Sequence, residues 1–150
     1  YRRASRLDES SDPEQVELAE RLYREAIRVD PKNALAHTNL GNILFRRKDM
    51  NGASEMYRKA LELDPEQSEA NYNLGYWHQE VSKQCGTAIC FYQEAIRLDP
   101  TFADAYYNLG IAYDRIGQRG LAKRAFSDYI RVEASGDWAD NARRYIERQS

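Results

Sequence analysis

The sequence predicts an all-α fold, a right-handed α-solenoid of repeated helix-turn-helix units that ends in a capping helix. Two observations carry this prediction. Short motifs recur every 34 or 35 residues along the chain, and a fixed period of that length is the mark of proteins built by stacking one supersecondary unit. Within each period the apolar residues follow the spacing i, i+4, i+7 and i+8, which is that of a helix face.

Two motifs keep the same register in every unit. An Asp-Pro pair places Pro31, Pro65 and Pro100 at separations of 34 and 35 residues. An Asn-Leu-Gly triplet recurs at residues 39–41, 73–75 and 108–110 with the same separations. The additional residue of the middle unit lies between these motifs, near Lys83 to Gly86, so we expect it in a turn.

Each unit carries two separate apolar stripes and is therefore predicted to be two helices. The first helix has the stripes Ala36, Leu40, Ile43 and Leu44, then Ala70, Leu74 and Trp77, then Ala105, Leu109, Ala112 and Tyr113. The second has Ala53, Met56, Tyr57, Ala60 and Leu61, then Ala88, Phe91, Tyr92, Ala95 and Ile96. Because proline suits a first helical turn and breaks a helix interior, the Asp-Pro pair is expected to separate consecutive helices.

Three glycines, Gly41, Gly75 and Gly110, fall in the middle of the predicted first helices. A glycine there costs about 1 kcal/mol relative to alanine, so its recurrence requires a packing reason. We expect a large ring from the second helix of each unit to lie against each glycine.

These motifs resemble the tetratricopeptide repeat family, whose 34-residue helix-turn-helix unit carries Leu-Gly, Tyr, Ala, Phe and Pro at set places. The resemblance implies a truncated N-terminal repeat at residues 1–33, three full repeats at 34–67, 68–102 and 103–136, and a capping helix at 137–150. Residues Tyr1 to Leu7 are expected to be the tail of the truncated repeat's first helix. Departures from the family pattern occur at Tyr129, Ala134 and His78.

The capping helix is predicted from the stripe Trp138, Ala142, Tyr145 and Ile146, which charged residues surround. The end of a solenoid needs a cap with a polar outer face. No similar cap precedes Tyr1, and no initiator methionine is present, so we expect the sequence to come from a longer chain. Two cysteines are too few for a disulfide framework, and a cytoplasmic location is expected by default.

Composition and motifs exclude several classes of function. The chain has 22 Lys and Arg against 24 Asp and Glu, a net charge of −2, whereas nucleic-acid binders and polybasic membrane modules carry a basic excess. No apolar run approaches the roughly 18 residues of a membrane helix. The sequence lacks a P-loop, a dinucleotide-binding glycine motif and a nucleophile elbow. We therefore predict no enzymatic activity, no cofactor, and no direct contact with nucleic acid or membrane.

The most chemically suggestive residues are His78, Cys85 and Cys90, with His37, because imidazole and thiolate groups are zinc ligands. Their spacing matches no compact zinc knuckle. His78 also occupies a core position of the repeat, so we interpret it as a buried histidine that replaces an aromatic ring, and we assign no metal.

The first helices of successive units are expected to line a concave groove. Asn39, Asn73 and Asn108 occupy the same position of each unit, and asparagine offers both a donor and an acceptor to a peptide backbone. This column resembles the asparagine ladder in the repeat region of O-linked N-acetylglucosamine transferase; alternatively, the asparagines serve helix packing. The same register assigns the other peptide-binding candidates, which are Thr38, Asn42, Phe45, Arg46, Tyr72, Tyr76 and Tyr107.

Chaperone-binding members of the family hold a terminal carboxylate of a peptide with lysine, asparagine and further basic residues. The resemblance carries those positions onto Thr38, Asn42, Asn73, Asp104 and Asn108, so every basic residue is missing. Asp104 would repel a carboxylate. An acidic chaperone tail is therefore disfavoured as a ligand.

The sequence as a whole predicts a protein-protein interaction module that binds an extended segment of a partner protein in the concave groove. Two alternatives stay open: self-association of the repeats into a homo-oligomer, and a role as the repeat region of a larger bacterial regulator.

Overall fold

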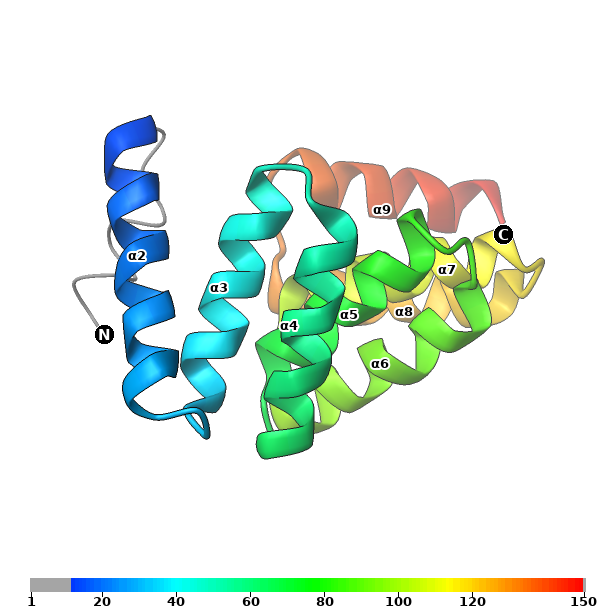
Figure 1. Cartoon of the computed structure of the whole chain (residues 1–150). Coiled ribbons are helices and arrows are strands. Elements are labelled where there is room, and N and C mark those ends of the chain that lie inside the picture. Colours follow the sequence, from blue (N-terminus) through cyan, green and yellow to red (C-terminus); the bar gives the residue numbers. More distant parts are fainter. Residues whose placement is uncertain (1–11, 150) are drawn as a thin grey trace. The chain divides into compact units, whose positions relative to one another are not determined.

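The computed structural model describes residues 12–149, and this part of the chain is all-α, with eight helices and no strand (Figure 1). The all-α prediction is confirmed, whereas the helix tail predicted at Tyr1 to Leu7 lies outside the described residues. The helices are α2 (Pro13–Val29), α3 (Ala34–Arg46), α4 (Met50–Leu63), α5 (Ser68–Glu80), α6 (Cys85–Leu98), α7 (Ala103–Arg115), α8 (Arg119–Val132) and α9 (Asp137–Arg148).

The chain divides into two compact parts, Tyr1–Ala70 and Asn71–Ser150. We call these parts the first and the second unit, and each is larger than one repeat. In the first unit α3 packs against both α2 and α4, as Figure 1 shows. A core cluster of Ala19, Tyr23, Leu40 and Ile43 joins α2 to α3. These residues lie at helical spacing on the two facing stripes, so the amphipathic pattern alone accounts for the contact.

In the second unit α7 packs against α6 and α8, and α9 packs against α8. One core cluster includes Tyr92 of α6 and Leu109 of α7. Another joins Phe126 of α8 to Ala139 and Ala142 of α9. The capping helix therefore buries its alanine face against the last helix pair.

An aspartate ends three helices in the same way. The backbone N–H groups of Asp30, Asp64 and Asp99 each donate to a carbonyl four residues earlier, at 2.8–2.9 Å. Each carboxylate Oδ1 then accepts from the N–H two residues on, at 3.0–3.1 Å. Because the residue in between is proline, which has no N–H to satisfy, the Asp-Pro pair makes a stable Asx turn between two helices.

The turns inside the helix pairs show where the middle repeat gains its residue. The turn between α3 and α4 takes residues 47–49 and that between α7 and α8 takes residues 116–118, whereas the turn between α5 and α6 takes residues 81–84. The prediction that the additional residue lies in a turn is confirmed.

The predicted packing of rings on glycines is also confirmed. A Cβ atom added to Gly41 would lie 2.7 Å from the Tyr57 ring. One added to Gly75 would lie 2.9 Å from the Tyr92 ring, and one added to Gly110 would lie 2.8 Å from Phe126. The first and second helices of each pair thus approach so closely that only a hydrogen fits between helix backbone and ring.

We expect Gly110→Ala to lower the free energy of unfolding by about 1–2 kcal/mol, because the cost of overpacking against Phe126 exceeds the gain in helix propensity. The matched control is Gly120→Ala in α8, where no heavy atom lies within 4 Å of the added Cβ. The control should raise stability by about 0.5 kcal/mol. Urea denaturation measures both, and equal stabilities of the two variants would contradict the packing.

Lys48 occupies a left-handed backbone conformation, with φ of 65°, at the end of α3. Gly117 occupies the equivalent position after α7, with φ of 81°. The N–H of the residue after each one donates to a carbonyl five residues earlier, at 2.9 Å. Both helices therefore end in a Schellman motif, whose left-handed residue favours glycine.

We accordingly expect Lys48→Gly to raise the free energy of unfolding by about 1 kcal/mol, since it removes the steric cost of a left-handed side chain. Gly117→Ala should have the opposite effect of similar size. Urea denaturation of both variants tests the pair, and a loss of stability on Lys48→Gly would show that the lysine side chain itself stabilises the turn.

Candidate functional site

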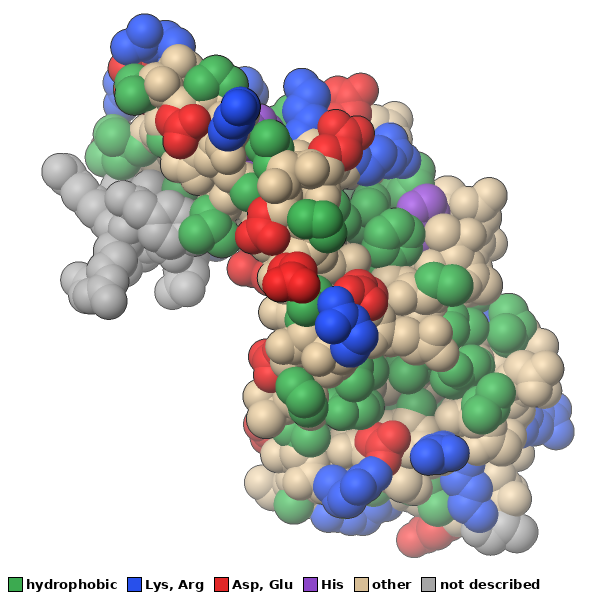
Figure 2. All heavy atoms as spheres, turned by 90° about the horizontal axis from the view of Figure 1, so that it is seen from below, with side chains coloured by type: hydrophobic (Ala, Val, Ile, Leu, Met, Phe, Trp, Pro, Cys, Tyr) green, Lys and Arg blue, Asp and Glu red, His purple; other side chains and the backbone are tan. Residues whose placement is uncertain are grey.

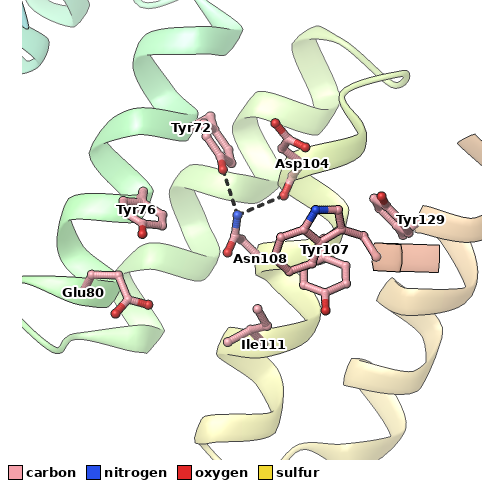
Figure 3. A pocket seen from close by; sticks show the side chains of 9 residues that line it. Tyr72, Tyr76, Glu80, Asp104, Tyr107, Asn108, Ile111 and Tyr129 are labelled. Carbon is pink, nitrogen blue, oxygen red and sulfur yellow. Dashed lines mark hydrogen bonds between the residues drawn. The ribbon is translucent and has the colours of Figure 1, made fainter. Parts of the chain in front are cut away.

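The second unit contains a cavity of about 420 Å³, shown in Figure 3. Helices α5 and α7 supply most of its wall, and α8 and α9 add one residue each. The lining residues are Tyr72, Tyr76 and Glu80 of α5, Asp104, Tyr107, Asn108 and Ile111 of α7, Tyr129 of α8 and Trp138 of α9. Four of the residues predicted to bind peptide, Tyr72, Tyr76, Tyr107 and Asn108, thus line one cavity.

Asn108 holds Tyr72 in place across the cavity wall. Its Nδ2 donates to the Tyr72 hydroxyl at 2.8 Å and to the Asp104 backbone carbonyl at 3.2 Å (Figure 3). These two bonds use both hydrogens of the amide group. The carbonyl oxygen Oδ1 of Asn108 is the part of the side chain that can accept a hydrogen bond from a ligand.

Contacts with neighbouring rings hold Tyr72 and Tyr107 in the cavity wall. The Tyr72 ring lies 4.9 Å from Phe102 and 5.7 Å from Tyr92, measured between centroids. Burial raises the pKa of the Tyr72 hydroxyl, and the Asp104 charge raises it further. Tyr107 makes three edge contacts, at 4.9 Å to Trp138 and at 5.2 Å to Phe126 and Tyr129.

Two carboxylates belong to the wall and differ in their surroundings. Glu80 Oε1 accepts from the Gln79 side-chain amide at 3.0 Å and from Arg115 at 2.9 Å. These bonds, that from Gln79 most of all, lower the pKa of Glu80. Asp104 is exposed in the first turn of α7 and has no ion pair among the described residues. None of the lining residues that the structure describes is Lys, Arg or His.

One wall residue corrects an expectation from the sequence. The sequence places Trp138 on the apolar stripe of the capping helix, yet Trp138 lines the cavity and is 61% exposed. The reason lies in the register of α9, which buries Ala139 and Ala142 against α8 and turns the preceding residue outward. An exposed tryptophan indicates a binding site, but the helical spacing alone does not reveal that Trp138 is exposed. Tyr129 also lines the cavity but belongs to a buried core cluster.

The predicted residues of the first unit lie in different surroundings. Thr38 and Asn39 are buried, with 1% and 4% exposed, although their register suggested a groove-facing position. The Thr38 hydroxyl donates to the Gln67 side chain at 2.9 Å, a partner that follows 29 residues later. Asn39 Nδ2 is buried without a hydrogen-bond partner among the described residues.

Asn42 links α3 to α4 and to the first turn of α5. Its Oδ1 accepts from the Tyr57 hydroxyl at 2.7 Å, and its Nδ2 donates to Glu69 Oε1 at 2.8 Å. Phe45 is half-buried and Arg46 is exposed; in the second unit Asn73 is half-buried and lies outside the cavity wall. The three asparagines at equivalent repeat positions, Asn39, Asn73 and Asn108, therefore lie in three different environments.

The residues considered for zinc do not come together. The His78 ring stacks on Phe91 with centroids 5.3 Å apart, and its Nδ1 lies 3.2 Å from the Ser82 hydroxyl. Cys85 packs against the core and Cys90 is exposed. Within residues 12–149 no group of three or more His, Cys, Asp or Glu side chains is arranged to hold a metal ion.

Acidic and basic side chains are interspersed on the face of the molecule seen in Figure 2, among patches of hydrophobic side chains. This mixture agrees with the net charge of −2. Among the described helices, none has the length and apolar character to cross a membrane.

Helix pairs that recur every 34 or 35 residues, each closed by a ring on a glycine, define an α-helical repeat protein. Models of the TPR repeat match residues 14–48, 41–81 and 84–117, and a tetratricopeptide repeat model matches residues 103–135. The chain belongs to the tetratricopeptide repeat family.

Solved structures agree with this assignment. Two structures of MamA are similar to the chain, with TM-scores of 0.74 and 0.75 at 28% and 27% identity. They cover 89% and 94% of this chain and 85% and 84% of their own. The first TPR of Spaghetti (RPAP3), bound to the HSP90 peptide SRMEEVD, has a TM-score of 0.72 at 22% identity, covering 80% of this chain and 94% of that one. No curated protein matches the chain.

The tyrosine hydroxyls of this fold predict a loss of stability at high pH. Burial raises the pKa of Tyr57, Tyr72 and Tyr92, and partial burial with the Asp114 hydrogen bond raises that of Tyr145 to about 12. Because the unfolded chain loses these protons first, near about pH 10, the free energy of unfolding should fall as the pH rises from about 10 to 12.

Urea denaturation across that range, with tyrosinate absorbance recorded in parallel, tests this prediction. Tyr145→Phe is the control, since it removes one of the shifted groups and should reduce the slope. A free energy of unfolding that stays constant or increases with pH would contradict the tyrosine environments described above.

Proposed function

We propose that this chain is a protein-interaction module without enzymatic activity, and that its second unit binds an extended segment of a partner protein. The observation that supports the proposal most strongly is the cavity of about 420 Å³, walled by five aromatic side chains and a few polar groups. A concave site of this size and composition is suited to holding a side chain of a ligand.

The helices present these groups in rows along one face. Tyr72, Tyr76 and Glu80 follow at four-residue intervals on α5, and residues at that spacing lie on the same side of a helix. Asp104, Asn108 and Ile111 form the second row on α7. A peptide that lies along these rows can place an apolar stem on the rings and a backbone N–H on Asn108 Oδ1.

The RPAP3 domain is bound to an HSP90 peptide. It supports the proposal only at the level of the fold, because it is 22% identical to this chain. Its peptide, SRMEEVD, is acidic. The clamp positions here carry no basic residue, and Asp104 lies in the cavity wall. We therefore propose a ligand other than an acidic tail.

We also propose repeat boundaries at residues 34, 68, 103 and 137. Helices α3, α5, α7 and α9 begin at these residues, which supports the division. The remaining candidates for peptide binding also stay within the proposal: Asn73 of the second unit and Asn42, Phe45 and Arg46 of the first. For Thr38 and Asn39 a peptide contact requires a rearrangement that exposes them, because both are buried.

Selection of peptides from a random phage-displayed library, followed by fluorescence anisotropy with the selected peptides, tests this function. We expect Trp138→Ala to weaken binding about tenfold or more, as removal of a central aromatic contact does, and Asn73→Ala with Asn108→Ala to weaken it as well. Leu121→Ala is the matched control, because Leu121 is an exposed apolar residue outside the cavity wall.

Circular dichroism should show unchanged helicity in the Trp138→Ala and Leu121→Ala variants, whose side chains are exposed. Failure to select any peptide, or equal affinities of these two variants, would refute binding at the cavity. Light scattering on the same samples tests self-association, which a mass independent of concentration and equal to one chain would exclude.

A further inference from the structure

The cavity wall is rich in aromatic rings. Its five rings belong to Tyr72, Tyr76, Tyr107, Tyr129 and Trp138. The faces of such rings carry negative electrostatic potential and attract ammonium and guanidinium groups within about 6 Å. Basic side chains in the wall would repel such a group, and none of the described lining residues is basic.

Asp104 adds a negatively charged carboxylate to the aromatic wall. Its charge contributes to the raised pKa of both Tyr72 and Tyr129, which lie on different helices of the wall. The dipole of α7 favours an acid in its first turn, which explains why Asp104 is tolerated there. The dipole does not explain why tyrosines of two other helices lie close enough to feel this charge, and the carboxylate has no ion pair among the described residues.

Glu80 lies two turns beyond Tyr72 on α5, with Tyr76 between them (Figure 3). Its charge is matched by Arg115, whose NH1 is 2.9 Å away. The side chains of this pair are 31% and 44% exposed, so water weakens the interaction. The wall and this pair together therefore keep one uncompensated negative charge, that of Asp104.

On the basis of the proposed function, we infer that the cavity binds a lysine or arginine side chain of the partner segment. The aliphatic stem of such a side chain packs on Ile111 and the rings, while its charged end lies against the ring faces and Asp104. This ligand is narrower than the non-acidic segment of the proposed function.

A pair of short peptides tests this inference on the full chain: acetyl-Gly-Arg-Gly-amide and its citrulline analogue, which has nearly the same shape but no charge. The nitrogen-labelled indole N–H of Trp138 reports binding by NMR. We expect the arginine peptide to bind about threefold to tenfold more tightly than the citrulline peptide, with a difference that shrinks as salt is added.

Two substitutions should move this preference in opposite directions. Asp104→Asn should reduce the arginine preference about threefold without changing citrulline binding, and Arg115→Gln should increase it, because Glu80 then lacks its guanidinium partner. Glu62→Gln is the control for net charge, since Glu62 is an exposed acid of α4 in the first unit.

The inference is wrong if the arginine peptide gives no saturable change at Trp138, if the citrulline peptide binds equally well, or if Glu62→Gln acts as strongly as Asp104→Asn. These results are distinguishable from failure of the proposed function. Selected peptides that depend on Trp138 but contain no basic residue would retain peptide binding at the cavity and reject the cationic side chain alone.

Discussion

The fold depends on the contact between a large ring of one helix and a glycine of its partner. Gly41 meets Tyr57, Gly75 meets Tyr92 and Gly110 meets Phe126, and in each case a methyl group on the glycine would overlap the ring. Such a contact sets the distance and the rotation of the two helices at once, because the ring fits in only one place. Once each pair is set in this way, the register of every other side chain on its helices follows.

That constraint also frees part of the molecule to vary. The second helices use their rings and alanines for packing, and the first helices use glycine and leucine for the same purpose. The opposite face of a first helix has no such duty, so α5 and α7 can carry Tyr76, Asp104 and Asn108 there. The cavity of the second unit is the result: its shape comes from a packing geometry that repeats along the chain, and its chemistry from the positions that packing leaves open.

The cavity is also a product of the capping helix. Ala139 and Ala142 are small enough to bring α9 close to α8, and this approach places Trp138 against Tyr107, with centroids 4.9 Å apart. The residue that closes the wall therefore belongs to an element whose first role is to cover the end of a core. A truncated chain without α9 would lose both the cover and the tryptophan of the cavity wall.

The sequence by itself determined the helix pairs, the breaks between helices at the Asp-Pro pairs, and the pairing of rings with glycines. These features are local or recur in register, so each repeat supplies independent evidence for the next. Four residues of the cavity wall were predicted in the same way. Only the tertiary structure decided which side chains are exposed: Thr38, predicted to face the groove, is buried and bonded to Gln67, whereas Trp138, predicted on an apolar stripe, is exposed. The physical reason is that the exposure of a side chain depends on neighbours from other helices, which the spacing within its own helix does not specify.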